Sequence, residues 1–124
     1  MRLIVDNRAG IHNQEAEIAF VDKKEALDWV GKLDGVQHTL IIFERKDGWQ
    51  LMVGGGPTQY IITLSDASNN LTFHNIAGDD SQVVELCAGG QFGEFPQNIC
   101  ATRKQAMQVV ATFFDGNESQ EDWI

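Results

Sequence analysis

The sequence predicts a single α+β domain, with an antiparallel sheet of about six strands and two helices mainly on one face of it. Three observations lead to this fold class. Short β-type runs follow one another at hairpin spacing, two amphipathic stretches begin with capping signals, and a length of 124 residues suits one domain. We therefore treat residues 1–124 as one unit.

Residues 1–20 are expected to add a hairpin at the edge of the sheet. Two short β-type runs, 2–5 and 15–21, are joined there by a polar segment. A helix is predicted next, because Asp22 and Glu25 have the spacing of a capping box. One apolar stripe follows, and Gly35 is placed to end the helix. The stripe consists of Ala26, Leu27, Val30 and Leu33.

The middle of the chain predicts an antiparallel meander. Asp47-Gly48 is a hairpin signal, and the glycines at 54–56 interrupt the chain again. The glycine-rich segment 89–96, which carries Phe92 and Phe95, is predicted to be a loop. The expected strands are 38–45, 49–53, 60–64, 71–74, 83–87 and 98–101.

A second helix is predicted near the end of the chain. Thr102 and Gln105 form its capping box, and Gly116 is placed to stop it. The residues between them repeat at helical spacing, and an acidic tail follows at 117–124. The repeating apolar residues are Ala106, Met107, Val110, Phe113 and Phe114.

Acidic residues outnumber basic ones by 18 to 9, which gives a formal charge of -9. Eight of the acids lie in residues 75–124, where only Arg103 and Lys104 oppose them, so an acidic face is expected there. This balance argues against nucleic acid and membranes as partners and favours a basic partner. No run suits a signal peptide or a membrane helix, and Cys87 and Cys100 are expected to be reduced, so we expect a cytoplasmic protein.

No catalytic motif stands out in the sequence. His12, His38 and His74 are far apart, without the local ligand pairs of zinc sites. The glycines at 54–56 lack the lysine of a phosphate-binding loop, and no serine stands in a nucleophile motif. We therefore expect a protein that is not an enzyme, with no catalytic residue, metal ion or cofactor. A site assembled in space from His, Cys and Glu side chains stays open as an alternative.

Several motifs follow one another in a specific order along residues 20–123. They are 22–27 (DKKEAL), Asp47-Gly48, 51–56 (LMVGGG), 60–63 (YIIT), 84–96 (VELCAGGQFGEFP), Ala106, 113–116 (FFDG) and Trp123. In this order and spacing the chain resembles immunity protein family 1 of bacterial polymorphic toxin systems. The run 84–96 is the most specific part of the resemblance. The family commonly has tyrosine where Phe95 stands, and residues 2–20 match no part of its pattern.

The resemblance implies an antitoxin, an α+β protein that binds and neutralises a cognate toxin domain inside the producing cell during bacterial competition. The toxins of this family are often zinc-dependent nucleic-acid deaminases, and the family has no shared catalytic residues. We expect the chain to inhibit a basic toxin domain of this kind by occluding its active site or substrate groove. The alternative is an acidic protein- or ligand-binding module unrelated to toxins.

The expected partner-binding residues combine acidic side chains with aromatic anchors. The uneven charge selects the acids, and Phe92 and Trp123 are aromatic residues in a predicted loop and in the tail. Whether Trp49, Tyr60 and Trp123 belong to the core or to an interface stays open at this level. The expected set is Asp79, Asp80, Phe92, Glu94, Glu118, Glu121, Asp122 and Trp123.

Overall fold

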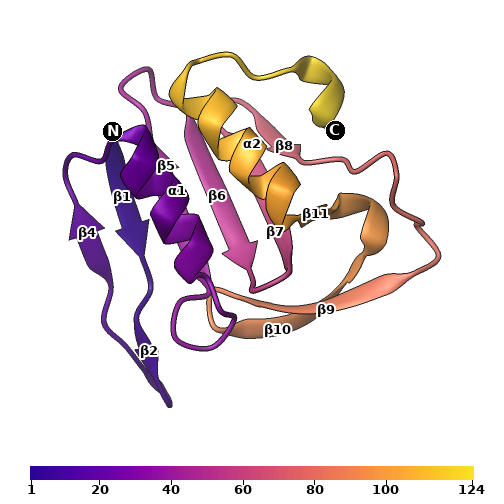
Figure 1. Ribbon diagram of the computed structural model, residues 1–124, viewed down its shortest axis with the longest axis horizontal. Helices are drawn as coiled ribbons and strands as arrows, with labels where there is room; N and C mark the ends of the chain where they lie inside the picture. The colour runs from indigo at the N-terminus through magenta and orange to yellow at the C-terminus, as the bar shows by residue number, and fades with distance from the viewer.

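The computed structural model describes residues 1–124 and has a central antiparallel sheet of seven strands (Figure 1). The strand order is β11-β7-β6-β5-β1-β4, and β8 also pairs with β7. This confirms the predicted α+β class, with one strand more than the sequence suggested. The strands are β1 (Arg2–Val5), β4 (Ala16–Ile18), β5 (Leu40–Glu44), β6 (Gln50–Gly55), β7 (Gln59–Ser65), β8 (Asn70–Thr72) and β11 (Cys100–Thr102).

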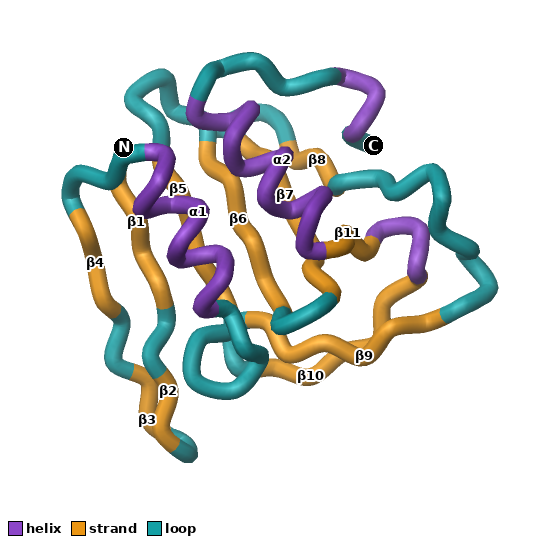
Figure 2. Tube along the Cα trace, in the orientation of Figure 1, coloured by secondary structure: helices purple, strands orange, loops and turns teal.

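Both helices pack side by side on one face of this sheet (Figure 2). α1 (Lys23–Lys32) begins where predicted, because the Asp22 carboxylate accepts a hydrogen bond from the Glu25 N–H at 2.8 Å. α2 (Arg103–Phe114) begins with the predicted capping box. A membrane span would need a longer and more apolar helix than either of these. Two short 3-10 helices complete the helical elements, η1 (Gln97–Ile99) and η2 (Gln120–Asp122).

The core lies between the sheet and the two helices. Alternate residues of the long strands point into it, as the period of two in the sequence predicts. Phe43, Tyr60 and Phe113 are its largest fully buried side chains. The Tyr60 hydroxyl has a partner there, because it donates to the Pro57 carbonyl at 2.8 Å. Tyr60 therefore belongs to the core.

The first twenty residues build one edge of the sheet. β1 pairs with β5 on one side and with β4 on the other, so β4 is the edge strand. Between β1 and β4, the short strands β2 (Arg8–Ala9) and β3 (His12–Asn13) form a separate ladder that extends beyond the sheet (Figure 2). Phe20, which follows β4, is 80 % exposed.

The prediction of a loop at 89–96 is wrong. β10 (Gln91–Pro96) pairs with β9 (Val83–Ala88) along its whole length, and Gly89-Gly90 forms the hairpin turn. Both turn glycines have positive φ, 62° and 77°, as a tight hairpin requires. With a third glycine inside the strand, the composition suggested a loop although the side chains alternate. β11 likewise starts two residues later than predicted, because η1 takes up the intervening residues.

The segment after α2 returns to the sheet and pairs with residues 72–74. Ile124 and Thr72 exchange two backbone hydrogen bonds, of 2.8 and 2.9 Å. The Trp123 ring packs edge-on against Phe73, with the ring centres 6.0 Å apart. This segment therefore covers part of the core beside α2.

Candidate protein-interaction surface

β9 and β10 form a two-stranded ribbon that crosses one end of the central sheet (Figure 1). Its inner face rests on β6. Leu86 lies against Gly55, and Ala88 lies so close to Gly54 that a side-chain carbon on Gly54 would come within 2.7 Å of it. Glycine is therefore required at position 54 for the ribbon to reach the sheet.

The opposite side of the ribbon faces away from the sheet. The register pairs Val83 with Pro96 and Glu85 with Glu94. Paired residues of an antiparallel ladder point to the same side, so these four side chains share one face with Phe92. Phe92 is 75 % exposed and Val83 is 62 % exposed. We call this surface the outer ribbon face; its exposed residues are Val83, Glu85, Phe92, Glu94 and Pro96.

The two glutamates of the outer ribbon face stand directly opposite each other without a counter-charge. Both Glu85 and Glu94 are exposed, and neither takes part in an ion pair. Like charges at directly opposed positions destabilise a β-ladder. No nearby part of the sequence supplies a compensating positive charge, because residues 47–102 contain six acids and neither lysine nor arginine.

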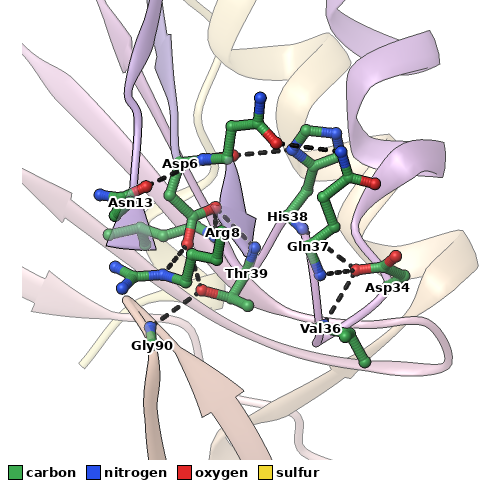
Figure 3. Close-up of polar contacts among 11 residues, drawn as sticks. Asp6, Arg8, Asn13, Asp34, Val36, Gln37, His38, Thr39 and Gly90 are labelled. Carbon is green, nitrogen blue, oxygen red and sulfur yellow. Dashed lines mark hydrogen bonds and ion pairs between the residues drawn. The ribbon is translucent and has the colours of Figure 1, made fainter. Parts of the chain in front are cut away.

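A buried carboxylate lies close to the ribbon's turn (Figure 3). Asp6, which directly follows β1, is 5 % exposed. One of its oxygens accepts the backbone N–H groups of Thr39 and Leu40, at 2.6 and 3.1 Å. The other accepts the Thr39 hydroxyl and, at 2.6 Å, the guanidinium of Arg8. With four donors around it, this carboxylate positions its neighbours and is not free for acid–base chemistry.

These hydrogen bonds among Asp6, Arg8, Thr39 and Leu40, which we call the Asp6 network, also fix the turn of the ribbon. The Thr39 hydroxyl oxygen accepts a hydrogen bond from the Gly90 N–H at 3.0 Å (Figure 3). The Arg8 guanidinium lies over Gly90, so a side chain at position 90 would have to displace it, and the φ of 77° at Gly90 also favours glycine. Segments from β1, β5 and the ribbon therefore meet at one point.

The loop between α1 and β5 adds a second group of contacts. An oxygen of Asp34 accepts the backbone N–H groups of Val36, Gln37 and His38 at 2.9 to 3.1 Å. Burial works against the ionised form of Asp34, but these hydrogen bonds outweigh it and hold its pKa below the ordinary value. The His38 ring nitrogen Nδ1 lies 2.7 Å from the Asp6 carbonyl oxygen. This loop is therefore fixed beside the Asp6 network.

The predicted partner-binding residues fall into three separate places. Phe92 and Glu94 lie together on the outer ribbon face. Asp79 and Asp80 lie in the connection between β8 and β9, where the Asp79 carboxylate accepts the Ser81 hydroxyl at 2.7 Å. The other four lie in the C-terminal segment, at the opposite end of the molecule from the ribbon in Figure 1. They are Glu118, Glu121, Asp122 and Trp123.

Two of the C-terminal residues have partners within the chain. Glu118 forms an ion pair with Arg45, a residue whose side chain is only 12 % exposed. Trp123 packs on Phe73, and together with Glu118 it borders an open hollow of about 350 Å³ that Trp49 also lines. Glu121 is exposed. The structure therefore does not bring the C-terminal acids together with Phe92 and Glu94.

Sequence reasoning missed Glu85 and Val83, which complete the outer ribbon face. The missed signal was the alternation within residues 91–96 after two consecutive glycines, which predicts a hairpin partner for residues 83–88. The Asp6 network has no comparable signal, because Asp6 and Thr39 are far apart in the sequence.

No protein-family model matches this chain, and no curated protein matches it. The structure contains no group of three or more His, Cys, Asp or Glu side chains arranged to hold a metal ion.

Proposed function

We propose that this chain is an immunity protein, which binds a basic toxin domain in the cytoplasm of the producing cell and neutralises it without catalysing a reaction. The toxin domain would act on nucleic acid, as a deaminase does. The proposal combines the sequence resemblance with the charge of the surface. It implies a partner that is a protein, and neither a nucleic acid nor a membrane.

One observation carries the proposal. The run 84–96, which is the most specific part of the resemblance, folds into the ribbon with an exposed aromatic ring beside two uncompensated carboxylates. Aromatic residues are frequent anchors of protein interfaces, and complementary charge steers association. A surface of this kind suits a basic protein partner.

The physical basis of neutralisation is competition for a positive groove. A toxin that acts on nucleic acid needs clustered lysine and arginine near its active site to bind phosphates. A deaminase must also admit an unstacked base to its pocket. An acidic protein that occupies the groove keeps the substrate out. A tight complex of this type buries about 800 Å² on each partner.

Co-expression with the protein domain encoded by the neighbouring gene tests the proposal. We expect restored growth of cells that produce the toxin domain, and a stable 1:1 complex by native mass spectrometry. A neighbouring domain that is not toxic, or one that never associates with this chain, would refute the proposal. A basic host protein recovered in its place would point to the module unrelated to toxins.

A further inference from the structure

We propose that the outer ribbon face is the docking surface for the toxin domain, and that Glu85, Glu94 and Phe92 together receive an arginine side chain of that domain. This inference rests on the proposed function. It adds the location of the interface and the chemistry of the central contact.

The register places two carboxylates where each can reach the same partner group. Opposed residues of an antiparallel ladder have their Cβ atoms about 5 Å apart, so Glu85 and Glu94 can both contact one cation. Neither carboxylate has a partner in this chain. The fold gains nothing from their repulsion, whereas a bound cation would remove it.

Arginine fits this position better than lysine. Its planar guanidinium offers five N–H donors, enough to satisfy two carboxylates at once. Phe92 stands on the same face, two residues before Glu94 on β10, within reach of a long side chain that crosses the ladder. A guanidinium also stacks favourably on an aromatic ring. Within this chain, Arg45 makes a comparable contact, with its guanidinium 4.3 Å from the centre of the Phe113 ring.

The outer ribbon face combines acidic residues with apolar ones. Charges on a ribbon can serve to prevent aggregation. Other apolar side chains of this chain are also exposed, such as Phe20 at 80 %, but Phe92 and Val83 differ because they share one face with the paired glutamates. These two residues flank the glutamate pair, one toward each end of the ribbon. The arrangement of apolar ends around a polar centre matches a docking surface for a protein.

The ribbon is also held in place before any partner arrives. Its turn is tied to Thr39 through the Gly90 N–H, and its inner face rests on the glycines of β6. A preorganised surface loses little conformational entropy on binding. The outer residues therefore contribute to affinity without ordering a loop.

The test compares variants of the full chain for binding to the purified toxin domain encoded beside it, by calorimetry at low salt. We expect Phe92→Ala to weaken binding about 30-fold, as for an interface anchor, and the double variant Glu85→Gln with Glu94→Gln to weaken it about 100-fold. Matched controls are Phe20→Ala and the double variant Glu15→Gln with Glu25→Gln, which make the same changes at exposed positions away from the ribbon. We expect both controls to bind within about twofold of the wild type.

Thermal unfolding separates docking from structural support. The double glutamine variant should unfold at the same temperature as the wild type or higher, because the repulsion across the ladder is removed. Hydrogen exchange in the complex should protect residues 83–96. Arginines of the toxin domain are then changed to glutamine one at a time. One of these changes should weaken binding to the wild-type chain but hardly affect binding to the double glutamine variant.

The failures of the two proposals can be told apart. A wild-type chain that neither binds nor neutralises the toxin domain overturns the proposed function and this inference with it. Tight neutralisation that is unchanged in all ribbon variants, with protection elsewhere, overturns only this inference. A homodimer of this chain that Phe92→Ala dissociates would assign the outer ribbon face to a second copy, and would overturn it as well.

Discussion

Asp6 shows how a single residue can connect distant parts of the chain. Its carboxylate is buried, and a buried charge is stable only with good hydrogen-bond partners. Burial raises its pKa, but the donors from Thr39, Arg8 and Leu40 outweigh burial and hold the pKa below the ordinary value. Three segments depend on this group, namely the end of β1, the start of β5 and the turn of the ribbon.

We expect Asp6→Asn to lower the free energy of unfolding by about 3 kcal/mol, because an amide nitrogen would face N–H donors. Urea denaturation measures the change, with the exposed Asp80→Asn as the matched control. Because the pKa of Asp6 is depressed, its ionisation stabilises the fold above the unfolded pKa, about 3.9, and this contribution is lost as the pH falls through the folded value. The acid dependence of stability should therefore be weaker in the variant. Equal dependence in both proteins would contradict this assignment.

At the scale of the element, the ribbon is fastened through its turn and its inner face. The Thr39 hydroxyl is the one side-chain group that both donates to Asp6 and accepts from Gly90. Thr39→Val keeps the shape of the side chain but removes both hydrogen bonds. The variant should lose about 2 kcal/mol of stability and exchange the Gly90 amide faster. Thr39→Ser keeps the hydroxyl and should match the wild type in both stability and amide exchange. An equal loss of stability in the serine variant would show that the methyl group of Thr39 stabilises the fold, and not its hydroxyl.

The C-terminal segment is the second element whose role can be tested. Trp123 packs on Phe73, and the neighbouring Glu118 pairs with Arg45, so these side chains are engaged within the molecule. We expect Trp123→Ala to lower stability by about 2 kcal/mol, as for a partly buried aromatic, without changing toxin affinity. Thermal unfolding and calorimetry on the same preparation measure the two effects. If the variant folds stably but binds the toxin domain more weakly, Trp123 is a partner-binding residue.

At the scale of the whole molecule, the charge is uneven. The strands from β6 to β11 and the ribbon come from residues 47–102, a part of the chain with six acids and no lysine or arginine. The negative electrostatic field of these acids speeds association with a basic partner. Raising the salt concentration from about 0.05 to 0.5 M should slow association with the toxin domain at least tenfold and change dissociation much less. Stopped-flow mixing measures both rates, and a salt-independent association rate would contradict electrostatic steering.

The parts of the fold that the sequence predicted are those with local signals. Helix caps and strand alternation depend only on residues that are close in the sequence. The caps at Asp22 and Thr102 therefore predicted both helices, and the alternating apolar residues predicted most of the sheet. Of the ribbon, β9 was predicted as a strand but β10 was predicted as a loop, because the glycines of the turn and of β10 are also typical of loops. Phe92 and Glu94 were predicted as partner-binding residues from aromatic content and charge, and the register places them together on the outer ribbon face. Glu85 required the register, and the Asp6 network required contacts between residues far apart in sequence.

The division of the ribbon into two faces separates stability from binding within one short element. Its inner face and its turn are fixed by contacts with the sheet and with Arg8. The exposed residues of the outer ribbon face lie outside the hydrophobic core, so substitutions there affect stability less than substitutions in the core do. Substitutions at these exposed positions should therefore change the binding of a partner much more than they change the stability of the fold.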